Sequence, residues 1–72
     1  QGVLHFNPYL PEEWDGYKFT IKFKGREILL KVDERGAHYS LISGENLIIK
    51  HMGKELKIFT NTEKTVDIKN LN

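Results

Sequence analysis

Strict alternation of apolar and polar residues marks the first clear element, which runs from Tyr17 to Lys24. Successive side chains of a strand point to opposite faces, so a period of two predicts a strand with one face in a core. A second apolar set with the same period follows Gly25 and predicts a strand that folds back on the first. The core residues expected from these and two later strands are Phe19, Ile21, Phe23, Leu30, Val32, Ile49 and Leu56.

Pairing of side chains across this first hairpin favours a two-residue loop at Gly25 and Arg26. That loop sets Phe23 opposite Ile28, and glycine suits the first position of a type II′ turn. A loop one residue earlier would set Phe23 opposite the charged Arg26. We therefore expect the register in which the two apolar residues face each other.

The same reasoning places the loop of a later hairpin at Met52 and Gly53. This loop brings Lys50 opposite Glu55, whereas a loop one residue later would oppose two lysines. Methionine is nevertheless an unfavourable residue for a left-handed turn position.

Glycine and polar residues separate several further short strands. We expect these at residues 37–42, 47–51, 56–59 and 65–69, with a leading strand through Val3, Leu4 and Phe6. One helical turn is expected at residues 11–14, where Pro11 suits the first helical position. Because no longer helical period occurs, the sequence predicts an all-β fold, a small antiparallel two-layer β-sandwich resembling a jelly roll.

Composition adds limits rather than a function. A chain of 72 residues encloses a single core, and 11 Lys and Arg against 10 Asp and Glu leave a net charge of +1, which names no partner. The absence of cysteine excludes disulfides and thiol nucleophiles. No apolar run approaches the ~18–20 residues of a membrane-spanning helix, so no membrane contact is expected. Because the chain starts at Gln1 without methionine, we expect a piece of a longer protein.

Candidate catalytic and metal-binding residues do not assemble in the sequence. His5, His38 and His51 fall on three different predicted strands without a local ligand pair, so no metal site is expected. Carboxylates surround Trp14, and glycoside hydrolysis uses a carboxylate pair, but neighbours in one turn cannot flank a glycosidic bond from opposite faces. We expect no catalytic residue, no cofactor and no small-molecule ligand on this chain.

Two binding functions are alternatives to a structural role. Lysines on the polar side of the first hairpin could hold single-stranded nucleic acid, yet the aromatic residues point to the other side, where they cannot stack on bases. A free-standing carbohydrate-binding module would need exposed aromatic residues such as Trp14 or Tyr9. We favour a solvent-exposed lysine face and expect no nucleic-acid partner. These lysines are Lys18, Lys22, Lys24 and Lys31.

The pattern of apolar residues also indicates a second apolar face, on the side of the strands opposite to the core. After the core is assigned, apolar residues remain on the opposite side, and if they gather on one sheet they mark a contact surface. We expect this face to dock on a larger body. Its residues are Leu29, Ile42, Ile48 and Phe59.

Several segments together resemble the C-terminal domain of glycoside hydrolase family 65 enzymes. The family pattern is an apolar strand, Pro-x-Leu-Pro, two residues, Trp, and a strand that ends in an aromatic-x-Gly-Arg turn. The segments that resemble it are Leu4-His5-Phe6-Asn7-Pro8-Tyr9-Leu10-Pro11-Glu12-Glu13-Trp14, Tyr17-Lys18-Phe19-Thr20-Ile21-Lys22-Phe23-Lys24-Gly25-Arg26, Ser43-Gly44-Glu45-Asn46-Leu47-Ile48-Ile49-Lys50 and Gly53-Lys54-Glu55-Leu56. The resemblance covers roughly residues 3–59. Met52 departs from the asparagine that family turns often place before the glycine.

This resemblance implies that residues 1–72 form a single C-terminal accessory domain, a jelly roll at the base of a helical barrel in a cytoplasmic enzyme. Such enzymes include maltose, kojibiose and trehalose phosphorylases and acid trehalases. Their catalytic residues belong to the barrel, so none is carried over to this chain, and the barrel is the expected partner. The motif residues are expected to anchor the N-terminal segment, with the indole laid across one end of the sandwich. They are Pro8, Leu10, Pro11 and Trp14.

Overall fold

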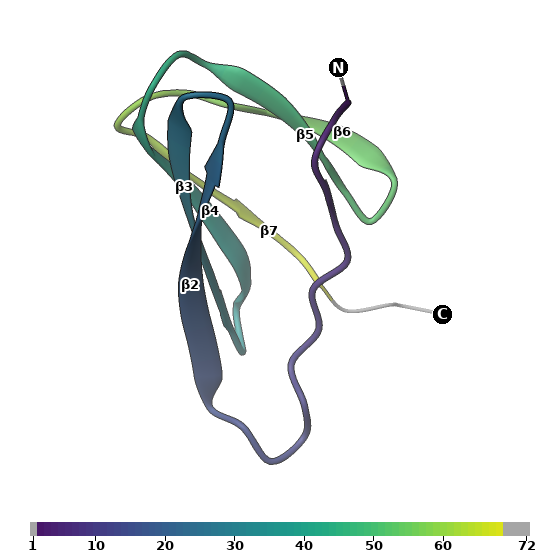
Figure 1. The fold of residues 1–72 in the computed structure, drawn as a ribbon. Helices are drawn as coiled ribbons and strands as arrows, with labels where there is room; N and C mark the ends of the chain where they lie inside the picture. Colours follow the sequence, from purple (N-terminus) through teal and green to yellow (C-terminus); the bar gives the residue numbers. More distant parts are fainter. Residues whose placement is uncertain (1, 69–72) are drawn as a thin grey trace.

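The computed structural model describes residues 2–68, which form two β-sheets arranged as a sandwich (Figure 1). One sheet has four strands in the order β2-β3-β4-β7, and the other has three in the order β1-β5-β6. The strands are β1 (His5–Phe6), β2 (Gly16–Phe23), β3 (Arg26–Asp33), β4 (Gly36–Ser43), β5 (Leu47–His51), β6 (Lys54–Ile58) and β7 (Glu63–Val66). The prediction of an all-β two-layer sandwich is confirmed. Within the described residues, no helix is long and apolar enough to cross a membrane.

Strand β1 differs from the expectation of purely antiparallel pairing, because it runs parallel to β5. Two backbone hydrogen bonds flank this short pair: Lys50 N donates to Leu4 O at 2.9 Å, and Met52 N donates to Phe6 O at 2.8 Å. Parallel strands need a long crossover rather than a tight turn. Here the whole β2–β4 portion of the chain separates β1 from β5 and provides that crossover.

Strand β7 lies earlier in the chain than the sequence pattern indicated. It spans Glu63–Val66 and pairs antiparallel with β4, with Val66 opposite Ala37. The expected strand at residues 65–69 therefore overlaps it only in part. Lys69, the last residue of that expectation, lies outside the described residues.

The β2–β3 hairpin turns at Lys24 and Gly25, so the predicted loop at Gly25 and Arg26 is wrong by one position. The φ angles of 51° at Lys24 and 80° at Gly25 are those of a type I′ turn, whose twist matches the flanking strands. Phe23 does lie opposite Arg26, but the guanidinium donates to backbone oxygens, with Nε 2.9 Å from Glu45 O. Because the pairing shifts by two residues, every side chain keeps its expected face.

The β5–β6 hairpin has the predicted loop at Met52 and Gly53, and Lys50 lies opposite Glu55. Both predictions are confirmed, as are the bounds of β5. The φ angles are 52° at Met52 and 86° at Gly53, so this is a second turn with two positive φ values. Methionine thus occupies a backbone conformation that most L-residues avoid.

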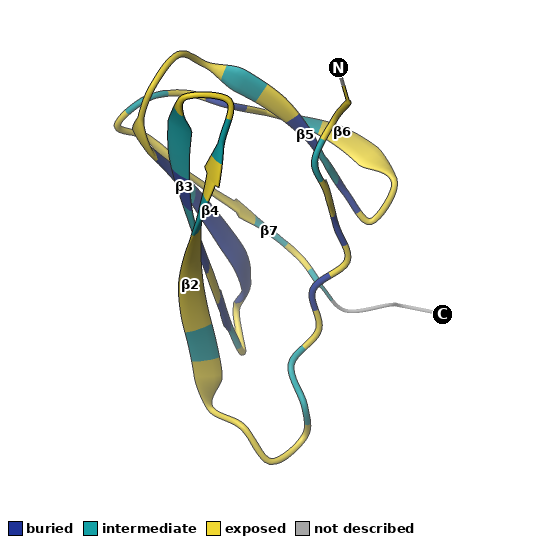
Figure 2. Ribbon diagram, viewed as in Figure 1, coloured by how far each residue is buried: buried dark blue, intermediate teal, exposed yellow. Residues whose placement is uncertain are grey.

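The core lies between the two sheets, and Figure 2 shows the buried segments in dark blue. Tyr39 is fully buried at its centre, and its ring meets Phe6 edge to face at 5.4 Å. Burial of apolar surface is the main favourable contribution to folding. The buried hydrophobic residues are Phe6, Ile28, Leu30, Val32, Ala37, Tyr39, Leu41, Ile49 and Ile58.

The three-stranded sheet is too short to cover the whole inner face of the four-stranded sheet. Its strands have 2, 5 and 5 residues, whereas β2, β3 and β4 have 8 each. In Figure 1 it lies over the upper end, and β2 extends below it. Phe19 was expected in the core, but it lies on β2, an edge strand of the four-stranded sheet, and is 42% exposed, so that expectation is wrong. Ile21, Phe23 and Leu56 are only partly buried.

A chain of hydrogen bonds joins the two sheets through the core. The Tyr39 hydroxyl lies 2.8 Å from His51 Nδ1, and His51 Nε2 lies 3.1 Å from the backbone oxygen of Asp67. A carbonyl oxygen only accepts, so in neutral His51 the proton sits on Nε2, and Nδ1 accepts from Tyr39. Burial, followed by the charge of Tyr17, raises the pKa of Tyr39 far above its usual value, so the hydroxyl remains a donor.

Candidate docking surfaces

Three aromatic side chains form an exposed group on the inner side of β2 and the segment before it; we call Trp14, Tyr17 and Phe19 the aromatic strip. Trp14 meets Tyr17 edge to face at 5.8 Å, and Tyr17 stacks on Phe19 at 6.2 Å with an angle of 5° between the rings. Trp14 is 54% exposed and Phe19 is 42% exposed. Tyr17 is partly buried against the core, so the strip continues the core onto the surface.

The segment before β2 holds the strip in place. Trp14 N donates to Pro11 O at 3.0 Å and closes a single turn, but the structure contains no helix here. The Tyr17 hydroxyl donates to Tyr9 O at 2.8 Å and ties the strand to the segment that precedes it. Pro8 is buried, and Leu10 packs against the core.

Trp14 is exposed rather than buried, and the expected position of its indole across one end of the sandwich stays a prediction. More than half of its side-chain surface is open. The segment before β2 lies below the three-stranded sheet (Figure 1), which leaves Trp14 without a second layer from that sheet. Pro8 and Leu10 lie deeper than Trp14, while Pro11 is partly buried.

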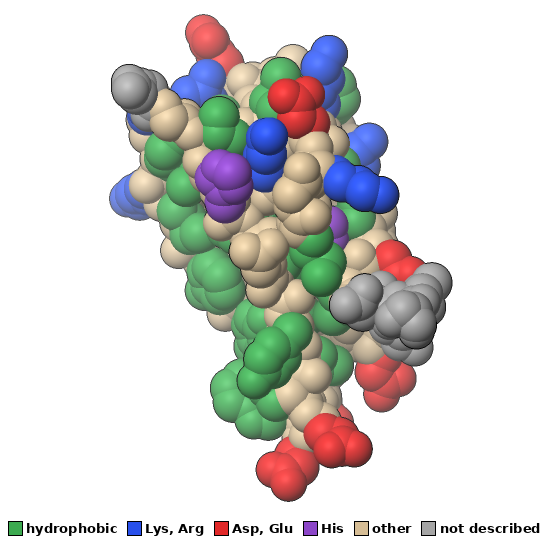
Figure 3. All heavy atoms as spheres, turned by 90° about the vertical axis from the view of Figure 1, so that its right-hand side faces the viewer, with side chains coloured by type: hydrophobic (Ala, Val, Ile, Leu, Met, Phe, Trp, Pro, Cys, Tyr) green, Lys and Arg blue, Asp and Glu red, His purple; other side chains and the backbone are tan. Residues whose placement is uncertain are grey.

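Acidic side chains surround the exposed indole. Glu12, Glu13 and Asp15 are all exposed, and together with Trp14 they form the tip of the segment before β2. Figure 3 shows hydrophobic side chains gathered at the lower end of the molecule, with acidic side chains at its tip. We call Glu12, Glu13 and Asp15 the acidic turn.

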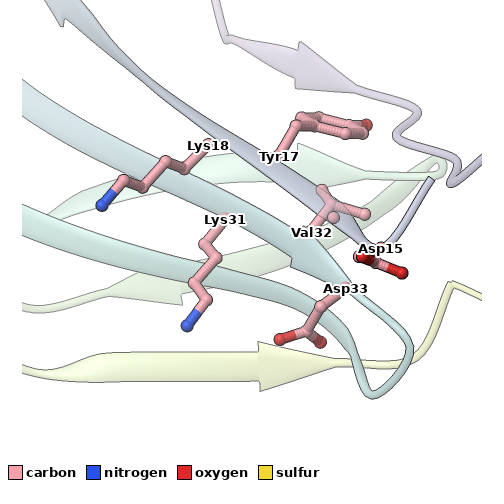
Figure 4. Close-up of a pocket in the computed structure, with 7 residues that line it drawn as sticks. Asp15, Tyr17, Lys18, Lys31, Val32 and Asp33 are labelled. Carbon is pink, nitrogen blue, oxygen red and sulfur yellow. The ribbon is translucent and has the colours of Figure 1, made fainter.

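Basic side chains lie on the opposite face of the same strands. Figure 4 shows Lys18 and Lys31 leaving the sheet on one side, with Tyr17 on the other. Lys18 and Lys31 are direct partners in the β2–β3 register. A hollow of about 370 Å³ at this end is lined by Asp15, Gly16, Tyr17, Lys18, Lys31, Val32 and Asp33. The lysines and the aromatic rings therefore occupy different faces, as the alternation predicted.

The exposure of Tyr9 (66%) and Trp14 (54%) meets the requirement stated above for a carbohydrate-binding module. The three rings of the aromatic strip do not, however, present their faces to solvent in one plane. Trp14 stands edge-on to Tyr17, and Tyr17 stacks on Phe19, so the three rings pack on one another. This arrangement is that of apolar packing more than of a flat surface for a sugar ring.

The four residues of the expected second apolar face do not share one sheet. Leu29 is half-buried on β3 between Thr20 and Ser40, on the outer side of the four-stranded sheet. Ile42 is exposed near the end of β4. Ile48 on β5 and Phe59 just after β6 do come together, since both line one hollow with Arg26, Asn46, Leu47 and Lys57.

The three histidines are dispersed, and no group of three or more His, Cys, Asp or Glu residues within residues 2–68 could hold a metal ion. His5 is exposed, and His51 binds Tyr39 in the core. His38 Nε2 lies 2.9 Å from Asp33 Oδ1, and Nδ1 lies 2.9 Å from Thr65 Oγ1. These bonds link the β3–β4 turn to β7.

The aromatic strip was missed because alternation identifies a face but not what covers it. Tyr17 and Phe19 lie on the face that the pattern assigned to the core. One signal was present: the strands expected at residues 47–51 and 56–59 are too short to cover an eight-residue partner strand. Three aromatic residues within six positions beside three carboxylates are a second such signal.

Fold and surface together define a small β-sandwich domain whose four-stranded sheet is incompletely covered. Comparison with known proteins makes the assignment more specific. The chain belongs to the family described as "Glycosyl hydrolase family 65, C-terminal domain", whose sequence model matches residues 1–58. The resemblance found in the sequence is thereby confirmed.

Similar curated proteins are disaccharide phosphorylases. The chain is 40% identical over 52 residues to the alpha,alpha-trehalose phosphorylase of Geobacillus stearothermophilus, a match that covers 72% of this chain and 7% of that protein. It is 46% identical over 45 residues to the maltose phosphorylase of Bacillus subtilis (strain 168), covering 62% of this chain and 6% of that protein. It is 34% identical over 59 residues to the kojibiose phosphorylase of Caldanaerobacter subterraneus subsp. tengcongensis, covering 81% and 8% respectively.

The chain thus spans less than a tenth of the length of these relatives. No solved structure matches it.

Proposed function

We propose that residues 1–72 form the non-catalytic C-terminal accessory domain of a cytoplasmic glycoside phosphorylase, a fragment whose role is to support a catalytic domain of the same polypeptide. The parent enzyme would cleave an α-linked disaccharide such as trehalose, maltose or kojibiose with inorganic phosphate. The names of the similar proteins support this reaction class. The family match supports the C-terminal position.

The observation that carries the supporting role is the incomplete cover of the four-stranded sheet. Eight large hydrophobic residues of the described chain are at least 40% exposed, and such residues mark a contact surface where they gather. We propose that Leu29, Ile42, Ile48 and Phe59 contribute contacts to the parent enzyme. Ile48 and Phe59, which share a hollow, are the stronger pair.

Deletion of this domain from the complete phosphorylase tests the proposal. We expect the truncated enzyme to lose thermal stability, because the surface of the catalytic domain that the accessory domain covers becomes exposed to water. We also expect the 72-residue chain alone to consume no inorganic phosphate with trehalose, maltose or kojibiose. Phosphate turnover by the isolated chain would contradict the non-catalytic role. An unchanged melting temperature after deletion would contradict the supporting role.

A further inference from the structure

We infer that the aromatic strip and the acidic turn form one docking site, occupied by a segment of the same polypeptide outside residues 1–72. That segment presents an apolar surface rimmed by lysine or arginine. This inference rests on the proposed function, because it requires the longer polypeptide. Beyond that function, it specifies where on this domain the contact lies and which side chains the partner surface carries.

The first argument is continuity with the core. Tyr17 and Phe19 pair in register with Val32 and Leu30, which are buried on the neighbouring strand. The strip therefore continues the inner face of the sheet onto its edge strand, β2, where it becomes exposed. A sheet face of this kind is stable when a second layer covers it. Within residues 2–68 the three-stranded sheet does not reach it.

The second argument is charge. Glu12, Glu13 and Asp15 are exposed around Trp14, while Lys18 and Lys31 leave the other face of the sheet. The surface that meets the strip thus has an apolar centre and an acidic edge. A partner with positive charge at its edge complements this surface, and an acidic partner would be repelled.

The third argument is preorganisation. The Pro11–Trp14 backbone bond and the Tyr17–Tyr9 hydrogen bond hold the rings before any partner arrives. Fixed aromatic side chains lose little conformational entropy on association. Tryptophan and tyrosine are also the residues that most often dominate the energy of protein contacts.

The fourth argument concerns the occupant. The chain corresponds to 7% of the length of a trehalose phosphorylase that it resembles, so most of such a polypeptide lies outside these residues. A covalently attached partner is present at high effective concentration, and a contact of modest area then suffices. A second copy of this chain is a weaker candidate, because its own acidic turn would lie near the first.

Oxidative footprinting tests the site without any substitution. Hydroxyl radicals would be applied to the 72-residue chain and to the complete protein, and oxidation of Trp14 would be compared with that of Met52 by mass spectrometry. Met52 is 40% exposed and lies at the far turn of β5–β6, so it is the internal reference. We expect the ratio of Trp14 to Met52 oxidation to fall at least about fivefold in the complete protein, as for a contact that excludes water. An unchanged ratio overturns the inference.

Substitutions in the complete protein test the chemistry of the contact. Phe19→Thr, and separately Glu12→Lys with Glu13→Lys, should restore Trp14 oxidation and expose the domain boundary to limited proteolysis. Val3→Thr is the matched control, since Val3 is 45% exposed in the segment before β1, away from the strip, and it should leave Trp14 protected from oxidation. Each variant is also melted as a 72-residue chain to show that it folds. Variants that fold and leave Trp14 protected overturn the inference.

Other occupants give distinct results. Protection of Trp14 in the 72-residue chain, together with a dimer mass, would replace the intramolecular partner by a second copy and overturn the inference. A saturable change of Trp14 fluorescence with maltose would replace it by a sugar and would also overturn it. The deletion experiment is independent: if deletion destabilises the enzyme but the strip variants have no effect, the supporting role stands and only this docking site fails.

Discussion

Asp33 is the residue at which the fold is most clearly sensitive to pH. Its carboxylate accepts from the His38 ring and from the backbone N of Arg35, which lies 2.9 Å from Oδ1. The hydrogen bond from His38 makes the largest contribution to lowering the pKa of Asp33 below its usual value, and the bond from Arg35 adds to it. The folded chain therefore favours the charged carboxylate.

The substitution Asp33→Asn should make the free energy of unfolding less dependent on pH in the acidic range. Because the pKa of Asp33 is lower in the folded chain than its ordinary value of 3.8, its contribution is complete above that value and is lost as the pH falls through the folded pKa. We expect the free energy of unfolding, measured with urea from about pH 5 to about pH 2, to decline less steeply in the variant.

A double-mutant cycle with His38→Gln identifies the partner. The coupling free energy between Asp33 and His38 should be present at about pH 5 and should decline as the pH falls through the folded pKa of Asp33, where the carboxyl becomes protonated. Equal coupling above and below that pKa would show that the hydrogen bond to His38 is not the cause.

At the scale of the strands, the conformation of the two tight turns sets the pairing register of each hairpin. Both β2–β3 and β5–β6 reverse through two residues with positive φ, and in each case glycine is the second of them. The sequence predicted the second register because Lys50 and Glu55 attract each other and the alternative opposes two lysines. The register of the β2–β3 hairpin could not be predicted from cross-strand pairing alone. Arg26 is satisfied by the backbone oxygens of Glu45 and Asn46, which belong to a loop distant in the sequence.

Met52→Asn should stabilise the β5–β6 hairpin. A left-handed conformation costs an ordinary L-residue about 1–2 kcal/mol, and asparagine recovers part of this through local hydrogen bonds. We expect the free energy of unfolding to rise by about 0.5–1 kcal/mol, measured by urea or thermal denaturation. Gly53→Ala, at φ 86°, should lower it instead. Equal effects of the two substitutions would argue against this turn.

The unequal size of the two sheets determines how much of the fold of the whole molecule could be predicted from the sequence. Alternation correctly placed Leu30, Val32 and Ile49 in the core, where each is at most 2% exposed. Phe19 and Trp14 could not be placed this way, since their exposure depends on where the opposite sheet ends. The proposed docking residues likewise lie on both sheets, with Leu29 and Ile42 on the four-stranded sheet and Ile48 on the three-stranded sheet.

Phe6 is the side chain through which the N-terminal segment joins the shared core. It is 9% exposed and packs on Tyr39, whereas Val3 in the same segment is 45% exposed. Phe6→Ala should lower the free energy of unfolding by about 3–5 kcal/mol, close to the whole stability of a domain this small. Val3→Ala should change it by at most about 0.5 kcal/mol. Thermal unfolding followed by circular dichroism compares the two, and similar melting temperatures would show that the segment is not part of the cooperative unit.

The parallel pairing of β1 with β5 also affects the order in which the strands can pair during synthesis. Positions 5 and 50 must meet, so β1, which is synthesised before the other strands of this domain, waits unpaired while the β2–β3 hairpin closes locally. Synthesis paused before residue 50 should therefore yield a nascent chain in which β2, β3 and β4 are paired while the segment of β1 remains open to protease.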